Sequence, residues 1–323
     1  RTAMKRRTVL GGIASAAVAV PGGFWAASAW AQTADIDVAL TEQTDNRILV
    51  FNRDDEFTDD KLKWSFSPGR GAGWKDMYEV RFRATKRYGT VALTAGGESG
   101  KAGLVGILAY DPANKPQTGL DDVLWSGRVD TYPHCVERIP DVLAVVVSGS
   151  RYGLHVFAPK NSDVATLKPV QDIEFPKAHG VLWDRTHNLL WAAGERELRT
   201  YSVSGTGYDL RLKQTGTTVA LPYNGHDIQP DYMDSSKFIV TDSDGVYSVD
   251  RVSREMTTIS TVRKIKSYTR LPNGEDMWTV EDNAGTRPWA GPTVYFTKDG
   301  KTTEKTRQGA EIYKARYVTT AWT

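Results

Sequence analysis

Short apolar runs rich in Val, Ile, Thr and aromatic residues fill the chain after residue 35, separated by Gly, Asp, Asn and Pro. Runs of this kind predict β-strands, and segments with the period of an α-helix are nearly absent. The strands fall into groups of four that recur about every 40 to 55 residues, which is typical of β-propeller blades. Five complete groups are predicted, over residues 79–129, 134–175, 179–219, 226–261 and 266–306.

Three predicted strands precede these groups and one follows them. The first three are Val38–Thr41, Arg47–Asn52 and Leu62–Phe66, and the last is Tyr313–Val318. Together they complete a sixth blade, and pairing the two ends of the chain in one sheet removes the open edges of the ring. We therefore predict an all-β fold, a six-bladed β-propeller closed by its N- and C-terminal strands, with residues 32–323 as one domain. Seven blades would require the segment Glu79–Val129 to be split.

Residues 1–31 predict an export signal. The basic residues Lys5–Arg7 precede an apolar stretch of small residues, and Ala29–Ala31 fits a cleavage site. The arginine pair followed by Thr-Val-Leu resembles a twin-arginine signal, although an ordinary secretory signal also fits. Pro21–Gly23 interrupts the apolar stretch, which is short for a membrane span. We expect a periplasmic or extracellular protein without stable membrane insertion after signal cleavage.

Charge and cysteine content narrow the classes of function. The formal net charge is +2, but four of the 41 Lys and Arg residues, and none of the 39 Asp and Glu residues, lie in residues 1–31. Residues 32–323 are therefore close to neutral, which gives no general electrostatic reason to expect binding to nucleic acid or to an anionic membrane. Cys135 is the only cysteine, so no intrachain disulfide can form.

An ionisable residue stands near the start of the inner strand of every predicted blade. Because these strands begin near one end of the central channel of a propeller, their first side chains are predicted to face one another there. A polar lining that only solvates the channel is the alternative interpretation. Alignment on these residues gives one carboxylate, three imidazoles and two ammonium groups: Glu79, His134, His179, His226, Lys266 and Lys314.

A metal site is the first functional interpretation of this set. Neutral imidazoles from three successive blades, His134, His179 and His226, can bind a divalent ion such as manganese, calcium or zinc and leave a position open for substrate. Glu79 would complete the shell or hold a water molecule.

An anion site is the second interpretation. Abstraction of the proton next to a uronate carboxylate needs a cation to neutralise the carboxylate and a base near the proton. The predicted cations are Lys266, Lys314, Arg81 and Arg316, and the predicted proton-transfer groups are His226, His179 and Tyr268. Trp74 and Trp289 lie in predicted loops and are candidates for stacking on sugar rings, with packing between blades as the alternative.

The segments Pro133-His134, Ala178-His179-Gly180-Val181, Gly225-His226-Asp227, Ile265-Lys266-Ser267 and Tyr313-Lys314-Ala315-Arg316 resemble those of uncharacterised secreted bacterial propeller proteins. In layout the chain is more distantly similar to propeller polysaccharide lyases. These include oligogalacturonate lyases, which have a His-rich metal site, and lyases that release rhamnose from glucuronate. They are usually seven-bladed. The resemblance implies an exported carbohydrate-active protein, a lyase on uronate-containing glycans, with a non-catalytic glycan-, peptide- or metal-binding propeller as the alternative.

Overall fold

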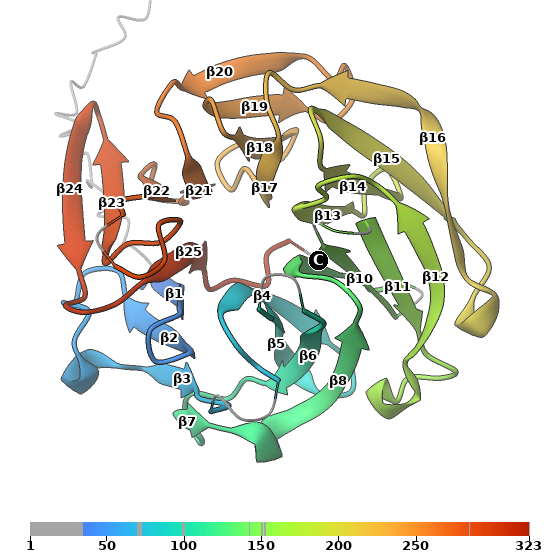
Figure 1. Cartoon of the computed structure of the whole chain (residues 1–323), viewed down its shortest axis with the longest axis horizontal. Coiled ribbons are helices and arrows are strands. Elements are labelled where there is room, and N and C mark those ends of the chain that lie inside the picture. Colours follow the sequence, from blue (N-terminus) through green and yellow to red (C-terminus); the bar gives the residue numbers. More distant parts are fainter. Residues whose placement is uncertain are drawn as a thin grey trace, which may run out of the picture. The chain divides into compact units, whose positions relative to one another are not determined.

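Six β-sheets form a ring in the computed structural model (Figure 1). It describes residues 35–69, 73–98, 101–141, 143–149, 151, 153–283 and 285–322. The predicted export signal, residues 1–31, lies outside the described residues. In the described part of the chain, helical structure is limited to four three-residue 3-10 turns. No helix there is long and apolar enough to cross a membrane.

The five complete blades each have four antiparallel strands, numbered here as blades 2 to 6 in chain order. Blade 2 consists of β4 (Met77–Thr85), β5 (Gly89–Gly96), β6 (Gly103–Ala109) and β8 (Val123–Val129). Blade 3 consists of β9 (Pro133–Ile139), β10 (Ala144–Gly149), β11 (Gly153–Ala158) and β12 (Lys168–Glu174). Blade 4 consists of β13 (Gly180–Asp184), β14 (Leu189–Ala193), β15 (Glu197–Ser204) and β16 (Arg211–Ala220). Blade 5 consists of β17 (Gly225–Pro230), β18 (Lys237–Asp242), β19 (Val246–Asp250) and β20 (Met256–Ser260). Blade 6 consists of β21 (Ile265–Arg270), β22 (Asp276–Val280), β23 (Thr293–Lys298) and β24 (Lys301–Thr306).

Blade 1 joins the two ends of the propeller, as predicted. Its order is β25 (Ile312–Tyr317), β1 (Asp37–Glu42), β2 (Arg47–Asn52), β3 (Trp64–Phe66) and β7 (Gln117–Thr118). The inner strand β25 pairs antiparallel with β1, so the last strand of the chain closes the ring on the first. The six-blade prediction is confirmed.

The two-residue strand β7 is a fifth strand that the sequence did not predict. It lies in the loop between β6 and β8 of blade 2 and pairs in parallel with β3 of blade 1. The segment Glu79–Val129 is long because it contains the four strands of blade 2 and also the short strand β7, which pairs with blade 1. A two-residue strand has too few positions to show an alternating pattern.

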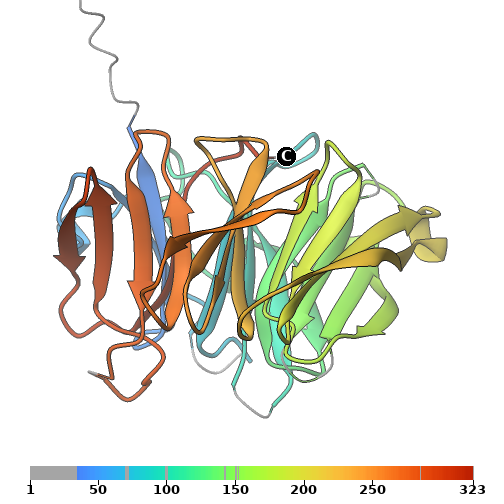
Figure 2. The same ribbon diagram turned by 90° about the horizontal axis from the view of Figure 1, so that it is seen from above.

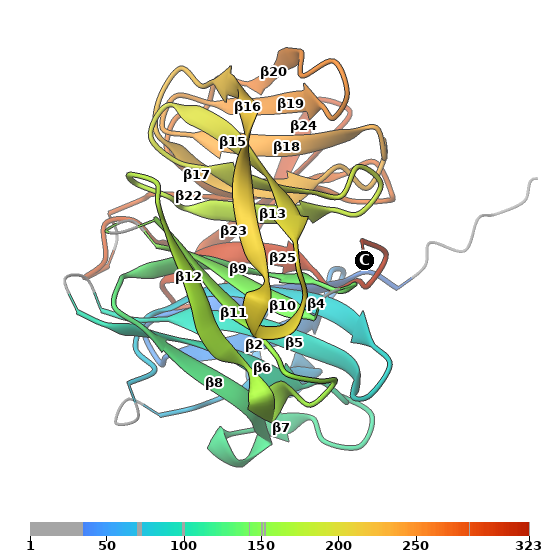
Figure 3. The ribbon, with the colours of Figure 1, turned by 90° about the vertical axis from the view of Figure 1, so that its right-hand side faces the viewer.

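The inner strands β25, β4, β9, β13, β17 and β21 surround the channel, and each contacts the next around the ring. Apolar side chains fill the spaces between adjacent blades, because both faces of each blade are covered by its neighbours. Figure 2 shows the blades from the side, with their strands running between the two ends of the ring. The outer strands β12 and β16 of blades 3 and 4 also contact each other (Figure 3).

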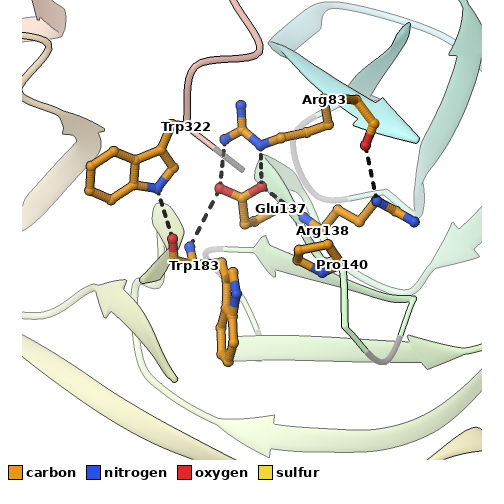
Figure 4. A pocket seen from close by; sticks show the side chains of 7 residues that line it. Arg83, Glu137, Arg138, Pro140, Trp183 and Trp322 are labelled. Atoms are coloured by element: carbon orange, nitrogen blue, oxygen red, sulfur yellow. Dashed lines mark hydrogen bonds and ion pairs between the residues drawn. The ribbon is translucent and has the colours of Figure 1, made fainter. Parts of the chain in front are cut away.

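After β25 the chain crosses to blade 4. The indole Nε1 of Trp322 donates a hydrogen bond of 2.8 Å to the carbonyl oxygen of Trp183 in β13 (Figure 4). The Arg251 guanidinium lies 4.9 Å from the Trp322 ring centroid. These contacts hold the segment against blades 4 and 5, at the end of the channel where the inner strands finish.

Candidate functional site

A β-bulge near the start of the inner strands sets the geometry of the channel mouth. In β9, Pro133 pairs with Gly149 and Cys135 with Ser148, so His134 has no partner in the ladder. The register shifts in the same way around Tyr78 in β4, His226 in β17 and Lys266 in β21. A bulge bends the strand and re-aims a side chain, so these residues are turned out of the blade faces.

The bulge residues form a ring that we call the mouth ring. Tyr313 lies in the corresponding bulge of β25, and His179 immediately precedes β13. One member comes from each blade: Tyr313, Tyr78, His134, His179, His226 and Lys266.

The five aromatic members of the mouth ring contact one another in sequence, from Tyr313 to His226. The centroid of Tyr78 lies 5.0 Å from that of Tyr313 and 5.3 Å from that of His134. His134 and His179 are stacked at 3.9 Å with an interplanar angle of 18°, and His226 meets His179 edge-on at 5.2 Å. The predicted convergence of the three histidines at one end of the channel is therefore seen in the structure.

The structure corrects the alignment of two of the six segments. Glu79 and Lys314 were aligned with the histidines, but they lie one residue further along their strands, and Tyr78 and Tyr313 occupy the mouth positions. Both charged side chains are fully buried. Alignment on ionisable residues could not find this offset, because the mouth position holds a tyrosine in these two strands and the residue that follows it is charged. The tyrosine that precedes each charged residue was the available signal.

Below the mouth ring, the Arg316 guanidinium bridges two buried carboxylates. Its Nε and Nη2 lie 2.7 and 2.8 Å from the Glu79 oxygens, and its Nη1 and Nη2 lie 2.6 and 2.7 Å from those of Asp227. Lys314 Nζ is 3.2 Å from Glu79 Oε2 and 3.5 Å from Asp227 Oδ1. Burial opposes ionisation of Glu79, but the charges of Arg316, Lys314 and Arg81 hold its pKa well below the usual range.

A second carboxylate group of this network lies deeper in the channel. Glu137 accepts hydrogen bonds from Arg83 at 2.7 and 2.9 Å and from Arg81 at 3.0 Å (Figure 4 shows the Arg83 pair). Arg81 also donates to the carbonyl oxygens of Val181 and Ile228, in blades 4 and 5. Four cations and three carboxylates, joined by these ion pairs, link blades 1, 2, 3 and 5 across the channel, and the hydrogen bond from Arg81 to Val181 adds blade 4.

The other predicted binding residues are placed as follows. Arg81, Arg316 and Lys314 belong to this buried network, so each is already paired with a carboxylate of the protein. Tyr268 packs with Ile239 between blades 5 and 6, away from the mouth ring. Trp74 is 2% exposed and lies in the core beside Phe66, so it offers no face to a sugar in this structure.

Trp289 is half-buried in the loop that precedes β23. Its Nε1 donates to Gln43 Oε1 at 2.9 Å. In the same loop, Arg287 pairs with Asp76, just before β4, at 2.6 Å and with Glu311 at 2.5 Å. The loop therefore reaches from blade 6 over blade 1 to the start of blade 2, on the side of the mouth ring.

The mouth histidines are neutral at pH 7. Burial lowers the pKa of His179 to about 4, and the charges of Lys266 and Lys314 add to this effect. Burial together with the same lysines lowers the pKa of His134 and His226 well below the usual range. Burial also lowers the pKa of Lys266, although its Nζ lies 2.6 Å from Glu281 Oε1.

The tautomer of His179 is fixed by its hydrogen bond. Its Nδ1 lies 2.7 Å from the carbonyl oxygen of Lys177, which can only accept, so Nδ1 is protonated and Nε2 holds the lone pair. His226 Nδ1 and His134 Nε2 are buried without a hydrogen-bond partner among the described residues. His179 is therefore the mouth histidine best placed to act as a base.

The orientations of the His134 and His179 rings do not suit the predicted metal site. A metal ion binds in the plane of an imidazole ring, about 2.0–2.1 Å from the nitrogen. His134 and His179 lie in nearly parallel planes, so one ion cannot meet both rings without rotation of at least one. Among the residues that the structure describes, no three His, Cys, Asp or Glu side chains are arranged to hold a metal ion.

Fold and channel together define a six-bladed β-propeller with an ion-paired channel and a ring of tyrosines, histidines and one lysine at its mouth. The chain belongs to a family of unknown function (DUF6528), whose sequence profile matches residues 119–322. No curated protein sequence matches it.

Solved structures with a similar fold include proteins from three bacteria. A functionally unknown protein from Desulfotomaculum acetoxidans is 12% identical with a TM-score of 0.52, over 87% of this chain and 79% of that one. A protein of unknown function from Bacteroides caccae is 14% identical with a TM-score of 0.56, over 88% and 99%. A protein from Lactobacillus plantarum is 11% identical with a TM-score of 0.57, over 88% and 100%. At these identities the likeness shows the fold alone.

Proposed function

We propose that the mouth ring binds a carboxylate-bearing glycan and removes a proton from it, as a lyase acting on uronate-containing glycans does. The observation that supports this most directly is His179, a neutral imidazole with its lone pair on Nε2, in the electrostatic field of Lys266 and Lys314. The charges of Lys266 and Lys314 contribute to the low pKa values of all three mouth histidines, so the mouth favours an anion.

The proposed reaction divides its tasks between two mouth residues. Lys266 leaves Glu281 and pairs with the substrate carboxylate, which makes the neighbouring carbon more acidic. His179 Nε2 takes the proton from that carbon, and the electron pair forms a carbon–carbon double bond as the adjacent glycosidic carbon–oxygen bond breaks. The leaving oxygen takes a proton from water. The bound carboxylate also raises the proton affinity of His179, which makes it a stronger base in the complex.

A screen of uronate polymers and plant gums tests this proposal, because the unsaturated product absorbs in the ultraviolet. We expect His179→Ala to lower kcat by about 10²- to 10⁴-fold, the usual contribution of a general base. Lys266→Ala is expected to lower kcat/KM. Lys264→Ala is the matched control, since Lys264 pairs with the same Glu281 at 3.1 Å but lies outside the mouth ring. Equal product from wild type and His179→Ala would contradict the assignment of the base.

A non-catalytic propeller is the second candidate. It is favoured by the internal pairing of Arg81, Arg316 and Lys314, which leaves Lys266 as the cation at the mouth. In this case no uronate polymer gives an unsaturated product, but calorimetry detects a glycan whose binding weakens with salt and with Lys266→Ala. Absence of both product and binding over the whole screen overturns the anionic-glycan proposal.

The alternative is that the site binds a divalent metal ion, with His134, His179, His226 and Glu79 as ligands. It requires rotation of a stacked ring and release of Glu79 from Arg316. We therefore expect manganese, calcium or zinc to leave the Tm unchanged. A bound ion at 100 times its Kd would stabilise the protein by about 2.7 kcal/mol. A rise in Tm that is lost in His226→Ala, or a metal found by elemental analysis of the purified protein, would restore the metal interpretation.

Export to the periplasm or the cell exterior is part of the same proposal. It rests on Lys5–Arg7, the apolar stretch and Ala29–Ala31. A fusion of residues 1–31 to a reporter that is active only after export tests it, with Arg6→Lys and Arg7→Lys together as the variant that separates twin-arginine from ordinary secretion.

A further inference from the structure

We propose that a second ligand site lies at the far end of the ring, in a groove between blades 2 and 3 that takes a small amphipathic carboxylate. The groove has a volume of about 590 Å³. It is bounded by the turns that follow the inner strands β4, β9 and β13, and by the loop between β11 and β12. Since the mouth ring lies where the inner strands begin, this groove is at the opposite end.

The floor of the groove is apolar. Val91 of β5, Ile107 of β6 and Leu167, which precedes β12, line it and belong to the hydrophobic core between blades 2 and 3. Half-buried Val164 and Tyr88 extend this surface along the wall. Small-molecule sites typically have volumes of 300–1,000 Å³, with mostly apolar walls and a few placed polar groups, and this groove fits that description.

The rim of the groove carries more cations than carboxylates. Arg87 and Arg185 line it and are balanced by ion pairs with Asp163 at 3.0 Å and Asp141 at 3.2 Å. Lys86 is exposed on the same rim. An anion is therefore the complementary ligand.

Arg138 is the cation that identifies the position of the anionic group. It lines the groove and is half-buried, and no carboxylate lies within ion-pair distance of its guanidinium among the described residues. Its side chain runs away from the Glu137 carboxylate toward the carbonyl oxygen of Ala84, at 3.4 Å (Figure 4). Burial lowers the pKa of Arg138, and the charges of Glu137 and Asp141 oppose this effect only in part. A carboxylate on the guanidinium would supply a further counter-charge in a bidentate pair.

The floor and the rim together favour a small amphiphile over an acidic peptide. A ligand with its carboxylate on Arg138 and an alkyl or aryl body along Val91 and Ile107 would use both features. A highly charged peptide would use the rim alone and leave the apolar floor uncovered.

Decanoate, kept below its micelle concentration, is the probe for this site. Calorimetry on the full chain is expected to show saturable binding, weakened at least tenfold by Arg138→Ala and only partly by Arg138→Lys, which keeps the charge but not the bidentate geometry. Val164→Trp, which fills the groove, is expected to abolish binding. Arg263→Ala, an exposed arginine of blade 5 outside the groove, is expected to bind decanoate like the wild type.

Three outcomes would overturn the proposal once the Tm values show that the variants are folded. One is equal affinity of wild type and Arg138→Ala for decanoate. Another is equal affinity of the wild type for decanol, which lacks the charge. The third is binding of a hexaglutamate peptide without binding of decanoate. The mouth ring is unchanged in all these variants, so failure here is independent of the glycan screen.

Discussion

We expect Arg316→Met to lower the free energy of unfolding by about 3–5 kcal/mol, the usual cost of removing one partner from a buried ion pair. Arg316 is 2% exposed and bridges Glu79 and Asp227, which are 0% and 1% exposed. In its absence, Lys314 lies 3.2 and 3.5 Å from the two carboxylates, and Arg81 lies 3.6 Å from Glu79, so Asp227 keeps Lys314 alone. Urea titration at pH 7.5, with the slope of the transition compared between variants, measures the change.

The double variant Arg316→Met with Asp227→Asn separates charge from packing. It removes one cation and one carboxylate, so the net charge of the network is unchanged and Glu79 retains Lys314. We expect it to recover at least half of the stability that Arg316→Met loses. Arg263→Met, at an exposed site, should change the free energy by no more than about 0.5 kcal/mol. A loss below about 1 kcal/mol in Arg316→Met would show that the network is hydrated and not buried as described.

The second large effect is a loss of stability in mild acid. His134, His179 and His226 have pKa values below that of an unfolded histidine, near 6.5, and that of His179 is about 4. As the pH falls from 6.5 toward 4, the unfolded chain takes up protons that the folded ring excludes, so stability decreases with decreasing pH. Each histidine contributes about 1.4 kcal/mol per pH unit, so the steepest slope expected for three is about 4 kcal/mol per unit.

The buried carboxylates add to this loss at lower pH. Glu79 and Glu137 are held ionised below their usual pKa by the arginines and Lys314, after the opposing effect of burial. Their contribution is complete above the unfolded pKa near 4.3 and is lost as the pH falls below it. The acid transition should therefore have two parts, one from the mouth ring and a lower one from the channel.

Urea titrations at pH 7.5, 6.0 and 5.0 check this prediction. Replacing His179 with Asn should reduce the slope of the free energy of unfolding against pH, between pH 6.5 and 5, by about 1.4 kcal/mol per unit, the contribution of one proton. His155→Asn, in the third strand of blade 3 and outside the mouth ring, controls for the loss of a histidine as such. A free energy of unfolding that stays constant from pH 7.5 to 5 would mean that the ring histidines are solvated and titrate as in the unfolded chain.

The same low proton affinity connects stability to the proposed function. A ring of neutral imidazoles costs stability in acid because burial and the charges of Lys266 and Lys314 oppose a new positive charge. An anionic ligand would compensate that charge, so its binding and proton uptake should be linked. Protonation of the mouth histidines is therefore unfavourable in the free protein and is expected to become favourable when an anionic ligand is bound.

The fold could be predicted from the sequence more completely than the site. The number of blades followed from the short apolar runs and their spacing. A strand that is covered on both faces appears in the sequence as a continuous apolar run, so it can be recognised without the structure. The unpaired strands 38–66 and 313–318 also determined the closure, because a ring with an open edge would leave backbone groups without partners.

The site was predicted in part. His134, His179, His226 and Lys266 were placed at the mouth because each begins an inner strand, and the strand starts are equivalent by symmetry. Glu79 and Lys314 were aligned with the mouth position although they lie one residue beyond it, because the alignment followed ionisable residues and the mouth position is a tyrosine in these two blades. Tyr78 and Tyr313 were missed as ring members for the same reason.

Patterns among neighbouring residues were enough to specify a six-bladed propeller closed by its two ends, with histidines and a lysine at the starts of its inner strands. The folded ring, in contrast, determines which charged side chains pair with one another inside the protein and which remain at the mouth. Arg316 meets Asp227 and Glu79 across 89 and 237 residues of chain. Contacts of that separation depend on the curvature of the whole ring, whereas strand period and blade number depend on neighbours along the chain.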